Sequence, residues 1–287
     1  MSAIGLPRAP AAVGGAPRFE HLRLLLRSPA FLVGLGIILF WVCCALFGRF
    51  FVDPLSDDIL NGLSPPSTEH WFGTDELGRD MFARVIAGSR DILVVAPLAT
   101  LLGIALGTAL GLVMGFFPGW VDDILSRIVE AVLALPLLIL ALLALTALGA
   151  SNSTVVAAIG LSFMPIVART VRAAVMTERS LDYVAAARLR GESALYLMVF
   201  EILPNILPPV VVELTVRLGY AIFTVATLSF LGVGLQPPSP DWGLAISENY
   251  ALIGGGYWWT VLFDALAIAS LVIAVNLVAD GLAEVAQ

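Results

Sequence analysis

The segment DYVAAARLRGESALYLMVFEILPN, residues 182–205, places a cluster of charges between two long apolar stretches. Its charged residues are Asp182, Arg188, Arg190, Glu192 and Glu201. A segment this polar is costly to hold in hydrocarbon. Its pattern predicts a short amphipathic helix, a turn at Gly191 and a second short helix that ends at Pro204. Such an element, held at a membrane surface, favours contact with another protein.

The composition is that of a membrane protein. The chain is 59% hydrophobic and 13% charged, whereas a soluble domain carries about 25% charged residues. Six apolar runs reach the roughly 20 residues that cross a bilayer, at 30–51, 91–117, 128–150, 154–174, 206–233 and 257–279. We therefore predict an all-α membrane protein of six transmembrane helices, with the polar segment between spans four and five.

Arginine sets the predicted orientation, since the chain contains no lysine. Arg8, Arg18, Arg23 and Arg27 precede the first span, which places the N-terminus in the cytoplasm. Six crossings return the C-terminus to the same side, and four crossings place the polar segment there too. The predicted regions are a cytoplasmic tail (1–28), a first span with an external loop (29–90) and a core of five spans (91–287).

Several functions are excluded by missing residues. A Walker A loop needs a lysine to reach the nucleotide phosphates, so this chain is not its own P-loop ATPase. Its two histidines, His21 and His70, fall on opposite sides of the predicted membrane and cannot share a metal. Cys43 and Cys44 are interpreted as small packing residues of the first span. We expect no catalytic group, metal, cofactor or nucleic-acid partner for this chain.

Four blocks in order carry a family resemblance. The first block is Asp-Tyr-Val-x-Ala-Ala-Arg (182–188), followed by Gly191 and by Leu-Pro-Asn (203–205). The other three blocks are FGTDELGRD (72–80), GWVD (119–122) and SFLGVGLQPPSPDWG (229–243). The first resembles the EAA loop of ABC transporter permeases. The four together resemble the C-type permease of dipeptide, oligopeptide and nickel importers, from about Leu22 nearly to the end of the chain.

The resemblance implies that the loop is a coupling helix that docks on a cytoplasmic ATPase. The residues it assigns to docking are Asp182, Tyr183, Ala186, Ala187, Arg188, Gly191, Glu201, Leu203, Pro204 and Asn205. It also implies a second permease, two ATP-binding subunits that carry ATP and Mg²⁺, and an extracytoplasmic substrate-binding protein. Membrane lipid surrounds the spans. The implied function is ATP-driven import of di- or oligopeptides across the inner membrane.

Other substrates and another class of transporter are compatible with the sequence. Haem, a nickel chelate or glutathione would be imported by the same class of transporter. A secondary transporter would need coupling-ion sites and inverted repeats, which the sequence does not display. The loop also departs from the family pattern, because Phe200 and Glu201 stand where relatives carry a basic residue and histidine, and Val225 replaces a frequent glutamate.

Two patterns within the spans allow more than one interpretation. Glu213 and Arg217 are four residues apart in span five, where they can pair along one helix face. They either bind the charged termini of a substrate or form a neutral structural pair. Gly103, Gly107, Gly111 and Gly115 line one face of span two, which favours close helix packing within the subunit or against a partner.

Overall fold

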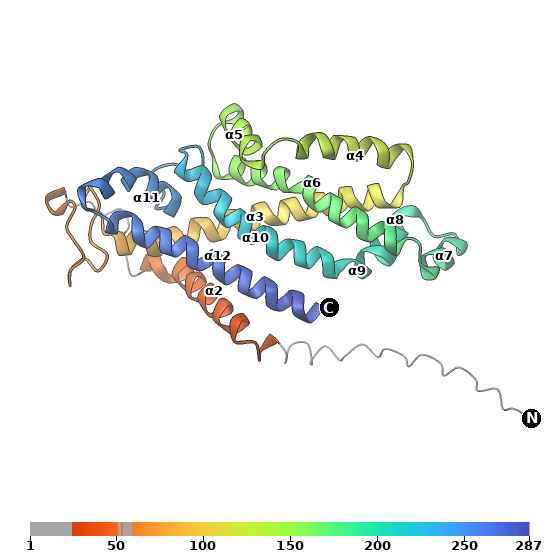
Figure 1. Ribbon diagram of the computed structural model, residues 1–287, viewed down its shortest axis with the longest axis horizontal. Helices are drawn as coiled ribbons and strands as arrows, with labels where there is room; N and C mark the ends of the chain where they lie inside the picture. The colour runs from red at the N-terminus through yellow and green to blue at the C-terminus, as the bar shows by residue number, and fades with distance from the viewer. Residues whose placement is uncertain (1–24, 51–52, 54–58, 287) are drawn as a thin grey trace, which may run out of the picture.

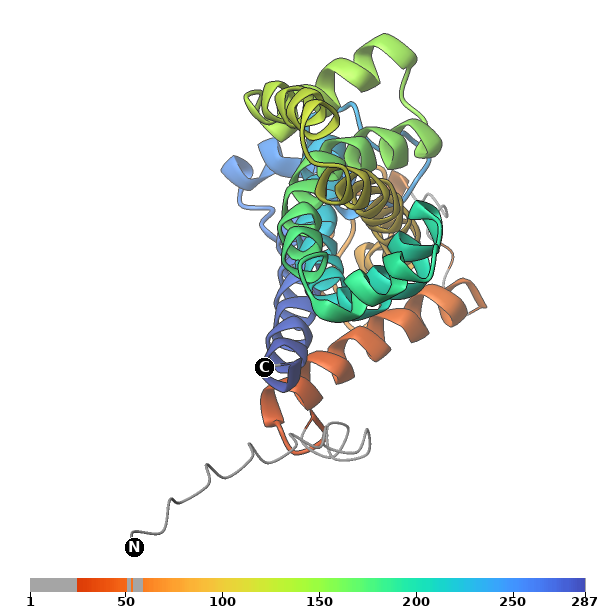
Figure 2. The ribbon, with the colours of Figure 1, turned by 90° about the vertical axis from the view of Figure 1, so that its right-hand side faces the viewer.

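The computed structural model describes residues 25–50, 53 and 59–286. Three of the four arginines that precede the first span belong to the tail 1–24, outside the described residues. Within the described ranges the regular secondary structure is helical. The helices form an elongated bundle with α7 and α8 at one end and α11 at the other, and Figure 2 views the bundle from the α7 end. We call these the loop end and the cap end.

Among the described residues, five helices are long and apolar enough to cross a membrane. They are α2 (Pro29–Phe47, followed by the 3₁₀ turn η1, Gly48–Phe50), α3 (Met81–Phe116), α6 (Asn152–Glu178), α10 (Leu207–Phe230) and α12 (Trp259–Ala286). The pair α4 (Trp120–Leu133) and α5 (Leu137–Leu148) adds a sixth crossing if it counts as one broken span. The predicted all-helical, multi-span fold is confirmed.

The third predicted span, 128–150, is wrong as a single helix. α4 and α5 meet at an angle of 86°. Pro136 stands at the junction as the residue before α5. Proline lacks a backbone N–H and its ring crowds the preceding turn, which favours a break in the helix at this junction. As a result α4 and α5 run in different directions, and both pack against α6 (Figure 1).

Side-chain caps fix where three of the long helices begin. The Ser28 hydroxyl accepts from the Phe31 amide, the Asp80 carboxylate from Ala83, and the Ser151 hydroxyl from Thr154. Each cap satisfies an amide that has no partner inside its helix. With Asp80 as its cap, α3 therefore begins at Met81, ten residues before the apolar run at 91–117.

The glycine face of α3 packs inside the chain, against α6. A Cβ built on Gly103 would lie 2.8 Å from the Phe163 Cβ, and one on Gly111 would lie 2.7 Å from the Val171 Cβ. Gly107 and Gly115 meet α6 in the same way. The two helices thus approach closely because four successive positions on this face of α3 are glycine and carry no side chain. The interpretation of packing within the subunit is confirmed.

The cap end is closed by a short helix from the segment between α10 and α12. α11 (Trp242–Asn249) is followed by the 3₁₀ helix η4 (Tyr250–Gly255). The Trp242 side chain is fully buried, and its indole N–H donates to the Val85 carbonyl of α3 at 2.8 Å. The 59–80 stretch begins with the short 3₁₀ helix η2 (Ile59–Asn61) and joins the same end, where the Thr74 carbonyl accepts from the Trp259 indole at 3.1 Å.

Candidate functional site

The 178–205 segment folds at the loop end as two helices joined by a turn. α7 spans Asp182–Leu189. The second helix spans Ala194–Asn205 and is built from α8 (Ala194–Tyr196), the π-helical η3 (Leu197–Ile202) and α9 (Leu203–Asn205). The predicted helix–turn–helix is present.

Gly191 makes the turn between the two helices. Its φ is +83°, and a Cβ built on it would meet no atom within 4 Å. Glycine is therefore required by the left-handed backbone and not by lack of space.

The ends of the two helices lie close to the predicted places. The N-cap of α7 is Leu181, which offers no side-chain hydrogen bond. The adjacent Ser180 hydroxyl donates to the Thr177 carbonyl at 2.7 Å. The second helix ends at Asn205, one residue after the predicted Pro204. The next span, α10, begins at Leu207 and has Pro208 in its first turn.

One face of the segment is buried against the chain's own helices. Val184 and Ala187 of α7 are 0% exposed, and Leu197 and Ile202 of the second helix join them in one apolar cluster with α6. Of the two alanines that the resemblance assigns to docking, Ala186 is exposed and Ala187 is buried. Ala187 packs the loop onto its own subunit, which corrects its assignment to a docking face.

A set of polar contacts joins the two helices to each other; we call it the clasp. Asn205 donates to the Glu201 carbonyl at 2.7 Å and to the Tyr183 hydroxyl at 3.1 Å. The Tyr183 hydroxyl donates to Glu178 at 3.2 Å, and burial together with the charge of Glu178 raises the pKa of this tyrosine. The Glu201 carboxylate accepts from Arg190 at 3.0 Å. Glu201 thus has an internal partner.

Arg188 lies against the end of α3. Its guanidinium carbon is 5.2 Å from the centre of the Phe116 ring, a cation–π arrangement. The neighbouring Arg179 donates to the Phe116 carbonyl at 3.0 Å. The end of α3 is therefore tied to the segment through two arginines.

The opposite face of the segment is apolar and exposed. Leu189 of α7 is 91% exposed, and Leu195, Val199 and Phe200 of the second helix are exposed too. Large apolar side chains grouped on a surface mark a site of protein or membrane contact. In the sequence, Phe200 differs from the family pattern; its exposure on this face follows from the fold.

Glu213 and Arg217 form the predicted pair on α10. The Arg217 Nε donates to Glu213 Oε2 at 2.9 Å, and the Thr170 hydroxyl of α6 donates to the other carboxylate oxygen at 2.8 Å. Both side chains are about 15% exposed. The Arg217 guanidinium also lies 5.5 Å from the centre of the Tyr220 ring. The pair is held between α10 and α6, and its role in a pathway stays a prediction.

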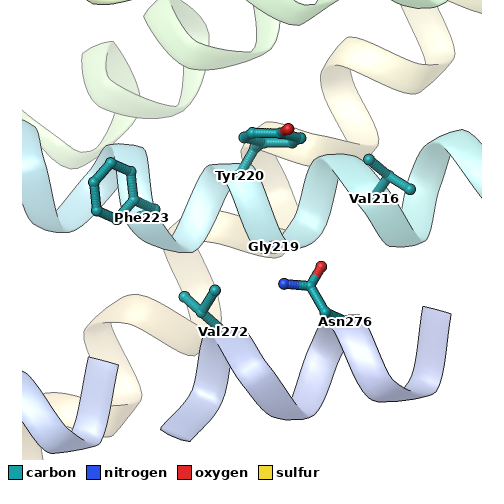
Figure 3. A pocket seen from close by; sticks show the side chains of 6 residues that line it. All are labelled: Val216, Gly219, Tyr220, Phe223, Val272 and Asn276. Atoms are coloured by element: carbon teal, nitrogen blue, oxygen red, sulfur yellow. The ribbon is translucent and has the colours of Figure 1, made fainter. Parts of the chain in front are cut away.

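A groove beside this pair lies between α10 and α12. Its volume is about 280 Å³, and its lining residues are Val216, Gly219, Tyr220, Phe223, Val272 and Asn276. In Figure 3 the Asn276 amide points across from α12 toward Gly219 on α10. The groove thus combines aromatic and aliphatic walls with a side-chain amide and a phenol.

One strong ion pair, between Arg172 and Asp122, has no signal in the sequence. Arg172 of α6 donates to both carboxylate oxygens of Asp122 on α4, each at 2.6 Å. Asp122 falls in the quoted GWVD block, but nothing in the sequence indicates its partner 50 residues away. The pair fastens α4 to α6 at the loop end.

Comparisons with known proteins agree with this architecture. Residues 107–286 match the family model described as "Binding-protein-dependent transport system inner membrane component". The chain is 37% identical to a di/tripeptide transport system permease protein of Pseudomonas aeruginosa, over 95% of this chain and 92% of that protein. It is 36% identical to a dipeptide transport system permease protein of Alkalihalophilus pseudofirmus (93% and 88%) and 36% identical to a glutathione transport system permease protein of Shigella flexneri (92% and 86%).

Proposed function

The chain belongs to the binding-protein-dependent transport system inner membrane components, and on that premise we propose that it is a permease of an ATP-driven importer of di- and oligopeptides. In this proposal it forms half of the translocation pathway, and a second, similar permease forms the other half. A substrate-binding protein delivers the peptide at the cap end. Two ATP-binding subunits, which carry the ATP and Mg²⁺, dock at the loop end on the cytoplasmic side.

The observation that carries the proposal is the two-faced 178–205 segment. Its inner face is already satisfied by the chain's own helices through Val184, Ala187 and the clasp. Its outer face leaves the apolar side chains of Leu189, Leu195 and Phe200 mostly exposed. A rigid element with an apolar outer face is what a docking surface for another subunit requires.

The clasp gives the loop a means of passing motion into the bundle. Asn205 lies two residues before α10 and is bonded to both Tyr183 of α7 and Glu201 of the second helix. A displacement of α7 is therefore passed through these hydrogen bonds to the start of α10. Closure of the ATP-binding subunits would rock α6 and α10 together, and the pathway would open alternately to each side.

Peptides are the proposed substrate because relatives similar over nine-tenths of the chain are named for dipeptides and di/tripeptides. The α10–α12 groove and the nearby Glu213–Arg217 pair offer aromatic, amide and charged groups of the kind that peptides bind. Glutathione is the second candidate, since a relative of equal identity is named for its transport.

The docking proposal is tested by subunit co-purification. Leu189→Asp and Phe200→Asp each place a carboxylate on the exposed face, and we expect ATPase subunits to be retained about tenfold less or worse, as for a central interface residue. Leu60→Asp is the matched control, because Leu60 is 96% exposed at the cap end. Unchanged retention in both loop variants would refute docking at this face.

The transport proposal is tested by uptake in reconstituted vesicles. We expect uptake of labelled dipeptides to require ATP and to continue when ionophores collapse the ion gradients. Competition by unlabelled tripeptides and by glutathione ranks the two substrate candidates. Uptake that follows an ion gradient without ATP would instead identify a secondary transporter.

A further inference from the structure

Four charged side chains form a compact network at the cap end. Arg79 donates to Asp75 at 2.7 Å and to Glu248 at 3.1 Å. Arg84 of α3 donates to the same Glu248 oxygen at 3.2 Å, and its Nε lies 4.0 Å from Asp75. Asp75, Arg79, Arg84 and Glu248 are the cap network. Its two positive and two negative charges balance, and they join the 59–80 stretch, α3 and α11.

Two further carboxyl groups are buried beside this balanced network. Asp264 of α12 and Asp241, which precedes α11, are both 0% exposed. One oxygen of Asp241 accepts from the Leu244 amide at 2.9 Å, and its other oxygen has no hydrogen-bond partner among the described residues. Neither carboxyl oxygen of Asp264 has a partner there.

The charged groups that act on Asp264 come from three neighbouring parts of the chain: α3, the 59–80 stretch, and α11 with the residue before it. Arg84 on α3 attracts its negative charge, whereas Asp241, Asp75 and Glu248 repel it. Arg84 is already shared with the carboxylates of the cap network. An ionised Asp264 would therefore be a buried charge without a cation of its own, and such a charge is unfavourable by several kcal/mol.

A proton removes this charge without any rearrangement of the network. Asp241, outside the membrane helices, illustrates the same effect, since burial raises its pKa to about 6, with Asp91 as a further nearby negative charge. The folded state holds this proton more tightly than the unfolded chain does. The stability that the proton contributes is therefore lost as the pH rises from about 4 through 6.

We propose that Asp264 is a proton-binding site that is occupied while α11 is packed in the cap end, and that opening of the cap end releases the proton to water. In the packed state the side chain is a neutral carboxylic acid. When α11 separates from α12, the exposed group ionises to a carboxylate and one proton. Closing the cap end takes the proton back.

Because of this site, the equilibrium between the packed and the open cap end depends on pH. The packed state holds one proton more than the open state, so raising the pH favours opening. Above the ordinary range of aspartate, the ratio of open to packed molecules rises by up to about tenfold per pH unit for one proton. Measurements between pH 7 and 9 lie above the titration of Asp241 and isolate Asp264.

Hydrogen exchange in the assembled transporter measures this ratio. The complex with its ATP-binding subunits is placed in nanodiscs, and exchange of the α11 amides is followed at pH 7 and pH 9, with correction for intrinsic exchange. We expect the opening population of the natural chain to rise by up to about a hundredfold. In Asp264→Asn the slope is expected to vanish, with α11 as protected at both pH values as in the natural chain at pH 7.

Asp280→Asn is the matched control, since Asp280 is an exposed carboxylate at the other end of α12; it should keep the full slope. A natural chain without a pH slope, or an Asp264→Asn variant that keeps it, would overturn the proposal.

Two further results count against it. Failure of both Asp264→Asn and Asp264→Leu to assemble would mean that an ionised Asp264 is needed to hold Arg84. Loss of protection at pH 9 when sodium is replaced by choline would assign the site to a metal cation instead of a proton.

Discussion

Replacing Gly107 by alanine tests the close approach of α3 and α6. A Cβ built at Gly107 lies 2.5 Å from the Val167 Cβ and 2.8 Å from the Met164 carbonyl oxygen. Ordinary carbon contacts lie at about 3.5–4.0 Å. The Met164 oxygen belongs to the backbone and cannot rotate aside, so the two helices must separate by about 1 Å.

The expected loss of stability follows from two opposing effects. Overpacking of a well-packed interior costs about 1–3 kcal/mol, while alanine in place of glycine favours a helix by up to about 1 kcal/mol. We expect a net destabilisation of about 1–2 kcal/mol. Thermal unfolding of the purified chain in detergent should detect it as a fall in Tm of several degrees.

Two other glycines separate packing from helix propensity. Gly36→Ala in α2 meets no atom within 4 Å and should be neutral or stabilising. Gly219→Ala meets only the Asn276 side chain, at 3.2 Å, and should be nearly neutral because that side chain can turn. If Gly107→Ala unfolds at the same temperature as Gly36→Ala, the close packing of α3 on α6 is refuted.

Three further predictions address the loop, the ion pair and the topology. Gly191→Ala should cost about 1–2 kcal/mol through its left-handed backbone and lower substrate-stimulated ATPase activity while the spans stay inserted; normal stimulation would contradict a coupling role. Glu213→Gln or Arg217→Gln alone should destabilise the chain by about 3 kcal/mol, and the double variant should recover most of that loss; full peptide uptake by the double variant would exclude substrate contact. A cysteine at Ser67 should react with an impermeant reagent from outside, and one at Ser193 only after permeabilisation; the reverse pattern would overturn the orientation.

The local features of the site were predictable from the sequence. Charge density between apolar runs located the 178–205 segment, and the 3.6-residue period of a helix was enough to place Glu213 and Arg217 on one face. Gly191 could be assigned to a turn because glycine alone adopts a left-handed backbone easily. These inferences depend on residues close together in the chain, whose geometry the backbone itself restricts.

The sequence by itself therefore determined a helical membrane protein, the place of its polar loop and the glycine face of α3. Tertiary structure alone decided which side of that loop is free, because Ala186 and Ala187 are identical side chains whose exposure depends on the position of α6. It also decided the partners of Arg172 and the isolation of Asp264. Both depend on distances between separate helices, and these distances are set by the packing of the whole bundle and not by spacing along the chain.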